Sequence, residues 1–369
     1  MNQNTTEFDQ LQSFVTSNLV DHQNLQLNFA LLADEQNEVN QLSDGLAGCI
    51  NLVDLKLFLR SSFIEKQNLT KIFSALIKCQ SLTTLNVNLD GNLICDEGAS
   101  ALGLILSKCS NLTSLILELY RNQIKIKGAN SLYSGISKCS KLVNLEIYLA
   151  FQQAEQILTE ESHDQINQNT KDSLDFDLTQ ITNLTQLAID FRYLKIGDEG
   201  LYQLGLILSQ CKNMECLKMY IDQNGFSEEC LPSFFIALSK CVKLTHLTLY
   251  MTLESCCQQS AFKVGQTISE QLNTQFLELW FQGDGNLQNL ISGLSSSNSL
   301  LSLYLWLDEQ SVLEDKYIQN IADALLKYKN LKNIKLLFYQ EEKYEQQIKK
   351  LFVKLRKLKR LINFDIEIV

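Results

Sequence analysis

Cysteine is the reactive residue with the most regular spacing in this chain, and its thiolate can bind metals or act as a nucleophile. Six of the eleven cysteines share one position of a repeated motif, C-x-x-Φ-x-x-L with Φ apolar: Cys49, Cys79, Cys109, Cys139, Cys211 and Cys241. The ligand spacing of a zinc site is missing. The number of cysteines is odd and many recur at one position of the repeat, which is typical of reduced thiols and not of disulfides. We therefore expect these side chains to be small buried hydrophobic groups.

Residues for other catalytic chemistry are sparse. The three histidines, His22, His163 and His246, have no cysteine, serine or carboxylate at a catalytic spacing, and we expect His246 in a turn. The pair Gly283-Asp-Gly285 lacks the third glycine of a dinucleotide-binding loop. The sequence shows no nucleophile elbow, P-loop or kinase motif. We therefore predict a protein that is not an enzyme and that has no cofactor and no metal.

Tyrosine and tryptophan recur at another fixed position, and large rigid rings are typical of protein-binding surfaces. The predicted partner-binding residues at this position are Tyr148, Tyr220, Tyr250, Trp280 and Trp306. Both tryptophans of the chain belong to this group. Tyr304, Asp222 and Asp308 occupy the neighbouring positions and complete the predicted site. The rings could instead stabilise one another by stacking, and that alternative remains open.

The elements that must position these residues follow from the full repeat, C-x-x-L-x-x-L-x-Φ-x-Φ. In its second half, apolar residues occupy every second position, which predicts a strand whose other side chains point away from the core. The stretch from Glu97 to Cys109 has apolar residues at helical spacing, and Asp96 is a plausible N-cap. We mark the strands by these residues: Leu25, Leu55, Leu85, Leu115, Leu145, Leu187, Leu217, Leu247, Leu277, Leu303, Ile334 and Phe364. Most steps between them are thirty residues long, which predicts a repeat architecture.

The pattern resembles the leucine-rich repeat proteins of the ribonuclease-inhibitor-like class. The strand core, the asparagines that follow it (Asn92, Asn122 and Asn224) and the helix start Asp96-Glu-Gly-Ala carry the resemblance, which covers about residues 15–369. It implies an α/β solenoid of about twelve repeats, with parallel strands on a concave face and α-helices on a convex face. Most copies lack the asparagine, which argues against a regular asparagine ladder.

We expect a single domain over residues 1–369, because a solenoid can exceed the size of one compact core. Residues 8–20 would form an N-terminal capping helix, and residues 341–369 a C-terminal capping helix and strand. The C-terminal helix is rich in lysine and could alternatively dock an acidic partner. The extra residues of the longest repeat, 151–178, would form a loop insert. This insert either contributes to partner binding or is a flexible polar loop.

Composition limits the classes of partner. The formal net charge is −10, which disfavours nucleic acid and anionic membranes. No apolar run has transmembrane length, and the polar N-terminus has no signal-peptide pattern. We expect a cytoplasmic protein with protein partners and no small-molecule substrate.

The function predicted from these observations is a non-catalytic scaffold that binds a partner protein through its concave face. A ciliary or cytoskeletal assembly would be a natural setting, although no motif indicates one. The alternative is regulation of an enzyme. Ran GTPase-activating proteins use a similar repeat followed by an acidic tail, whereas this chain ends in a basic helix and a strand, which disfavours that alternative.

Overall fold

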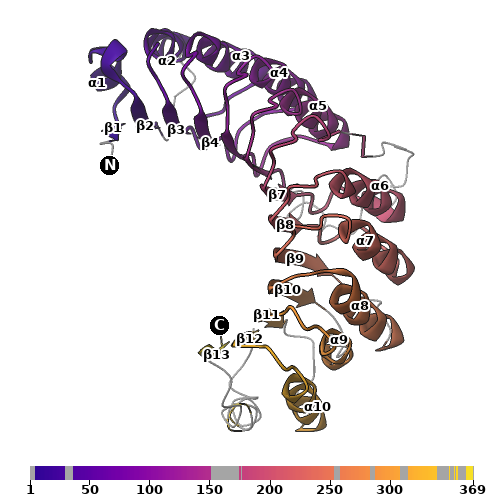
Figure 1. Ribbon diagram of the computed structural model, residues 1–369. Helices are drawn as coiled ribbons and strands as arrows, with labels where there is room; N and C mark the ends of the chain where they lie inside the picture. Colours follow the sequence, from indigo (N-terminus) through magenta and orange to yellow (C-terminus); the bar gives the residue numbers. More distant parts are fainter. Residues whose placement is uncertain are drawn as a thin grey trace, which may run out of the picture. The chain divides into compact units, whose positions relative to one another are not determined.

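The computed structural model describes residues 5–29, 36–150, 174–175, 177–252, 258–282, 287–307, 315–338 and 363–368, with Lys349, Val353 and Leu355. The chain forms two compact units, Met1–Leu194 (unit 1) and Lys195–Val369 (unit 2). The single domain stays a prediction. In each unit the strands line one side and the helices the other (Figure 1). The fold is a leucine-rich repeat solenoid.

Unit 1 contains seven of the described strands, and its neighbouring strands are parallel. They are β1 (Thr6–Phe8), β2 (Asn24–Asn28), β3 (Asp54–Phe58), β4 (Thr84–Asn88), β5 (Ser114–Glu118), β6 (Asn144–Tyr148) and β7 (Gln186–Asp190). The leucines that marked the predicted strands pair directly: Leu25, Leu55, Leu85, Leu115, Leu145 and Leu187. Strand β1 was not predicted from the sequence.

The helices of unit 1 are α1 (Leu11–Val15), α2 (Gln36–Gly48), α3 (Lys66–Ala75), α4 (Asp96–Leu106) and α5 (Ile126–Ile136), with 3₁₀ turns η1 (Leu19–Asp21) and η2 (Leu76–Lys78). The capping helix predicted over residues 8–20 is shorter, because Phe8 pairs in β1 and a separate turn follows α1. Helices α4 and α5 approach closely. A Cβ on Gly135 would lie 2.2 Å from the carbonyl oxygen of Gly103, so this crossing requires glycine.

Unit 2 repeats the same alternation. Its strands are β8 (Cys216–Tyr220), β9 (His246–Thr252), β10 (Phe276–Gln282), β11 (Ser302–Leu307), β12 (Asn333–Phe338) and β13 (Asn363–Ile368). Its helices are α6 (Gly197–Ser209), α7 (Leu231–Leu238), α8 (Gln258–Gln271), α9 (Leu287–Leu294) and α10 (Asp315–Leu326), with a 3₁₀ turn η4 (Glu228–Cys230). The strands are parallel and keep the predicted register of Leu217, Leu247, Leu277, Leu303, Ile334 and Phe364. None of the described helices is both long enough and apolar enough to span a membrane.

The core lies between the strands and the helices of each unit. Alternate strand residues point inward, so Leu85 and Val87 are fully buried while Asn86 between them is partly exposed. From the helices, residues such as Leu102 and Leu106 of α4 are also fully buried. One repeat alone would leave these side chains in water, and stacking of neighbouring repeats buries them.

An asparagine bridges consecutive repeats where the sequence provides one. The Asn92 amide donates to the carbonyls of Leu59 and Leu89, both at 2.8 Å, and its Oδ1 accepts from the backbone N–H groups of Ser62 and Ile64. Asn122 and Asn224 repeat this arrangement in part, as shown by their bonds to Leu119 O and Ile221 O. These bonds are 3.0 and 2.8 Å long. The asparagines are therefore structural.

Asp96 differs from the prediction, because it does not cap its own helix. It is the first residue of α4, and Cys95 holds the N-cap position. Its Oδ1 instead accepts from the backbone N–H groups of Lys125 (2.7 Å) and Gly128 (3.1 Å) at the start of α5. Asp198 in unit 2 likewise accepts from Ser227 N at 2.7 Å. Each aspartate thus satisfies helix-start donors of the following repeat.

Several predicted segments fall outside the described residues. They include 151–173 of the predicted insert, Asp308, and most of the predicted C-terminal helix and its lysines. At the end of the insert, Leu174 and Leu178 are buried. In the C-terminal segment, Lys349, Val353 and Leu355 are helical, and Leu355 is fully buried.

Candidate partner-binding surface

Four aromatic side chains stand in one register on the strand side of unit 2. Tyr220 pairs with Tyr250, Tyr250 with Trp280, and Trp280 with Trp306. Their strand neighbours point inward, so the rings must leave the core, and each is partly exposed. We call Tyr220, Tyr250, Trp280 and Trp306 the aromatic row. Leu337, next in register, is 2% exposed, so the accessible row ends at Trp306.

The rings of the aromatic row touch one another. Tyr220 and Tyr250 stack with centroids 4.5 Å apart and planes at 24°. Trp280 meets Tyr250 edge-on at 5.4 Å and 77°, and Trp306 is tilted toward Tyr250 at 6.5 Å. Such contacts stabilise each pair by about 0.5–1.5 kcal/mol beyond its burial. The row is therefore pre-organised, and this result keeps the stacking alternative open.

Glu278 anchors two of these rings. It lies two residues before Trp280 on β10, so both side chains leave the same face of the strand. One carboxylate oxygen accepts from the Tyr250 hydroxyl (3.2 Å) and from the Trp306 indole N–H (2.8 Å). The other oxygen accepts from the Thr248 hydroxyl at 3.3 Å. A single carboxylate thus fixes the orientation of an aromatic side chain on each neighbouring strand.

Trp280 has no such anchor. Its indole nitrogen is buried and has no hydrogen-bond partner, although its ring is partly exposed. A buried donor without an acceptor costs about 1–3 kcal/mol. The edge-on contact with Tyr250 is the described interaction that orients the Trp280 ring.

A second set of rings lies earlier on the same strands: His246 and Phe276 four residues before the aromatic row, and Tyr304 two residues before it. His246 stacks on Phe276 at 5.7 Å and 22°, and Phe276 meets Tyr304 edge-on at 4.9 Å. His246 is the first residue of β9, so its predicted turn position was wrong. The Thr245 hydroxyl lies 2.9 Å from its Nδ1. Together with the aromatic row, these rings widen the apolar surface of unit 2.

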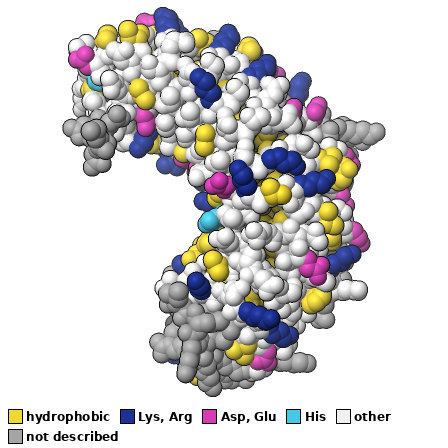
Figure 2. Space-filling model, in the orientation of Figure 1, with side chains coloured by type: hydrophobic (Ala, Val, Ile, Leu, Met, Phe, Trp, Pro, Cys, Tyr) yellow, Lys and Arg dark blue, Asp and Glu magenta, His cyan; other side chains and the backbone are white. Residues whose placement is uncertain are grey.

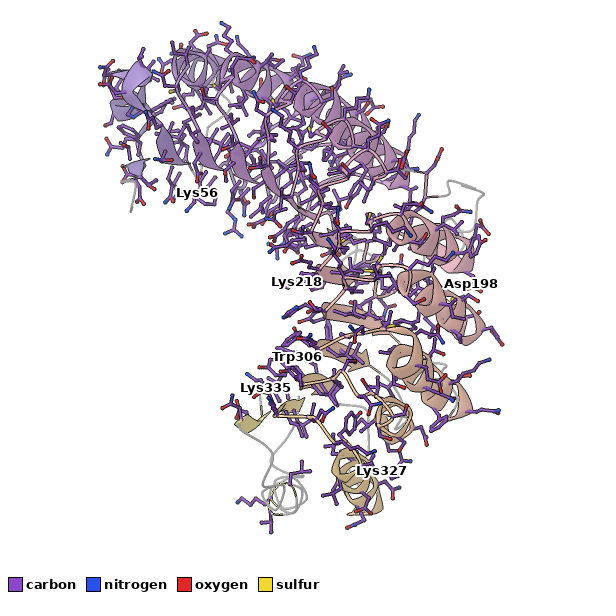
Figure 3. The ribbon with its side chains drawn as sticks, in the orientation of Figure 1. Lys56, Asp198, Lys218, Trp306, Lys327 and Lys335 are labelled. Carbon is purple, nitrogen blue, oxygen red and sulfur yellow. The ribbon has the colours of Figure 1, made fainter. Side chains whose placement is uncertain are left out.

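Side chains leave unit 2 on two opposite sides, the strand side and the helix side. Lys218, Trp306 and Lys335 point away from the strands, whereas Asp198 and Lys327 lie on the helix side (Figure 3). Hydrophobic side chains also reach the surface on the strand side of unit 2 (Figure 2). Lys218 is exposed, and Lys335 lies 3.9 Å from Asp365. Charged groups therefore border the rings, as in many protein interfaces.

The remaining predicted site residues do not all join this surface. Tyr148 belongs to unit 1, where its hydroxyl donates to Glu146 at 2.8 Å and its ring lies 5.8 Å from Tyr120. Asp222 is only 8% exposed, so it offers a partner little surface. Asp308 lies outside the described residues. The structure thus brings together the aromatic row and Tyr304, and leaves Tyr148 in the other unit.

Part of the strand side of unit 1 carries polar groups that pair with one another. The Asp90 carboxylate accepts from Tyr120 N (3.0 Å) and the Asn88 amide (3.3 Å), and forms an ion pair with Arg60 at 3.4 Å. Burial raises the pKa of Asp90 despite these partners. Burial, and then the charge of Asp90, raises the pKa of Glu118. These groups therefore bind one another.

The repeated cysteines are buried in both units. Burial raises the pKa of the thiols of Cys49 and Cys139 to about 12, and those of Cys79, Cys109 and Cys241 to about 11. A thiol with so high a pKa is a poor nucleophile at neutral pH. The prediction that these are small buried side chains agrees with this geometry.

The comparisons with known proteins identify no family. No protein-family model and no curated protein matches the chain. One similar solved structure is the complex of Rad7 and Elc1 in yeast, with 15% identity and a TM-score of 0.48. The match covers 98% of this chain and 79% of that chain. At this level of similarity, function must be argued from the residues of this chain.

The role of Glu278 was not predicted from the sequence. Its bonds run diagonally to residues on β9 and β11, twenty-eight residues away in each direction. The available signal was a carboxylate two residues before an outward tryptophan, with aromatic donors at the same register on both neighbouring strands. Diagonal neighbours lie within reach of long side chains.

Proposed function

We propose that this protein is a non-catalytic scaffold of the ribonuclease-inhibitor-like repeat class that binds a partner protein through the strand side of unit 2. The observation that carries the proposal is the aromatic row, where four partly exposed rings stand in one register on a rigid sheet. Tyrosine and tryptophan dominate binding energy in many interfaces because they offer large contact areas at low entropic cost.

The exposed ring faces favour this function over a purely structural ladder. Rings that serve only to stabilise a sheet need no exposed face, whereas these remain accessible beside Lys218 and other charged groups. Their orientation is also fixed before binding by Glu278 and by neighbouring rings. A pre-organised surface loses less entropy when a partner binds.

We place the protein in the cytoplasm, within a larger assembly that could be ciliary or cytoskeletal. The repeated cysteines occupy buried positions, which suits the reduced thiols of a reducing compartment. The partner is a protein, because the surface is open and lined by several rings rather than closed around a small molecule.

The test is affinity capture with the full chain, followed by mass spectrometry. The variants Trp280→Ala and Trp306→Ala remove rings from the proposed surface. The matched controls are Tyr202→Ala and Phe262→Ala, which remove exposed aromatic rings (52% and 43% exposed) from helices of the same unit. Each variant is first checked by thermal melting.

We expect a defined set of proteins to be lost from both tryptophan variants and kept by both controls. Each tryptophan should contribute about 2 kcal/mol or more to binding. The proposal fails if both tryptophan variants capture the same partners as the wild type. Early melting with normal capture would identify the row as a structural ladder.

A further inference from the structure

Glu278 is a carboxylate at the centre of an aromatic surface, and its three observed partners are all neutral. They are the hydroxyls of Thr248 and Tyr250 and the indole N–H of Trp306. These donors orient the carboxylate, but they do not cancel its charge. Because the side chain is partly buried, solvent screens that charge less than at an open surface.

No cation of the described part of unit 2 pairs with Glu278. The ion pairs found among the described residues are Arg60–Asp90, Arg192–Asp190 and Lys335–Asp365. Along the register of Glu278, the nearest lysines are Lys218 on β8 and Lys335 on β12. Both are two strands away, roughly 10 Å, which is about one Debye length at 0.1 M salt.

The rings around Glu278 suit a cation as well. The electron-rich faces of tryptophan and tyrosine attract a cation within about 6 Å, and tryptophan does so most strongly. Trp280 lies between Tyr250 and Trp306, the two side chains that donate to Glu278. A planar guanidinium can stack on a ring and pair with a carboxylate at the same time.

We propose that the Glu278 carboxylate and the rings of Tyr250, Trp280 and Trp306 form a recognition site for an arginine side chain of the partner protein. This inference rests on the proposed function, and it names the chemistry that the partner must present. A partner arginine would supply the missing positive charge, and its flat head group and methylene stem would lie against the aromatic row.

The experiment uses peptides in matched pairs. An array of random twelve-residue peptides, each containing one arginine, is printed beside twins in which citrulline replaces that arginine. Citrulline keeps the shape and removes the charge. The full chain is applied to the array, and pairs that bind are titrated in solution. The readout is intrinsic fluorescence, since both tryptophans of the chain lie at this site.

We expect the wild type to bind the arginine peptides about tenfold more tightly than their citrulline twins. Glu278→Gln keeps an acceptor for Tyr250 and Trp306 but removes the charge, and it should abolish the preference. The matched control Glu270→Gln changes an exposed carboxylate on α8, which bonds Gln266 at 2.8 Å. It should leave the preference intact. Thermal melts of both variants verify folding.

Two results overturn the inference. One is the absence of an arginine preference in the wild type, including the absence of any binding to the array. The other is an unchanged preference in Glu278→Gln. If both twins bind equally and Trp280→Ala abolishes that binding, the aromatic row still binds partners and only the arginine assignment fails. If Trp280→Ala and Trp306→Ala bind as the wild type does, the proposed function fails too.

Discussion

Hydrogen bonding distinguishes the two tryptophans, although they stand side by side in the same register. The indole N–H of Trp306 donates to Glu278, whereas the indole nitrogen of Trp280 is buried without a partner. Removing a hydrogen-bond donor from a charged acceptor is costly, while removing an unsatisfied buried donor relieves a desolvation cost. The same substitution should therefore affect the two positions differently.

We predict that Trp306→Phe lowers the free energy of unfolding by at least about 1 kcal/mol more than Trp280→Phe. Phenylalanine keeps a ring at both positions and removes only the N–H and part of the ring area. Chemical denaturation of both variants measures the difference. Equal losses would show that the bond to Glu278 contributes nothing measurable.

The buried thiols predict a loss of stability at high pH. The pKa of Cys109 rises from an ordinary value of 9.0 to about 11 because of burial. Because the pKa is higher in the folded state, the thiol's contribution to the free energy of unfolding is complete below pH 9. It is lost as pH increases toward 11, since the unfolded chain releases the proton more readily. At pH 10 the loss should be on the order of 1 kcal/mol per thiol.

Melting temperatures measured between pH 8 and 10 test this prediction. Tyr133 and Tyr328 also have raised pKa values, so the wild type is compared with Cys109→Ala. The variant should be less stable at pH 8, because it loses buried volume, but its stability should decrease less between pH 8 and 10. If the stability of the wild type and of Cys109→Ala decreased equally between pH 8 and 10, the raised pKa of Cys109 would be contradicted.

At the scale of elements, the aspartates at helix starts join consecutive repeats. Asp96 belongs to α4 yet satisfies two backbone donors at the start of α5. We predict that Asp96→Ala lowers the free energy of unfolding by about 1–2 kcal/mol, as the loss of an N-cap does. Asp96→Asn keeps the oxygen acceptor and should cost less. Denaturation curves of the two variants supply the comparison, and equal losses would exclude a capping role.

The strand pattern was the most predictable part of the fold. Every marked residue from Leu25 to Phe364 lies in a strand, because inward apolar residues at period two leave one register that buries them. Strand β1 escaped prediction because Thr6–Phe8 lacks that alternation and pairs only at the edge. Asp96 was misassigned because its partner is supplied by the next repeat, which local capping rules do not consider.

The candidate site was predictable only in its row of rings. The repeat period placed Tyr220, Tyr250, Trp280 and Trp306 together, since in-register repeats bring equivalent positions side by side. The burial of Asp222 and the central role of Glu278 depend on side-chain directions between strands. Those directions follow from packing in three dimensions and not from the period.

At the scale of the whole molecule, the thirty-residue period has one long interruption. The step from Leu145 to Leu187 is longer than the others, yet both residues pair in register. We predict that deleting residues 160–171, which lie outside the described part of the chain, restores the period and preserves a cooperative melt. Loop segments commonly tolerate such changes. Loss of the cooperative transition in calorimetry would show that the segment is structural.

The cysteines give the molecule a built-in set of local reporters. The Cys79, Cys139 and Cys241 thiols donate to the carbonyls of Leu46, Leu106 and Leu208, each in the preceding repeat. An alkylating reagent can therefore reach such a sulfur only after two neighbouring repeats separate. Pulse labelling followed by peptide mass spectrometry would time the opening of these three junctions, and so reveal the order in which they open, without any engineered probe.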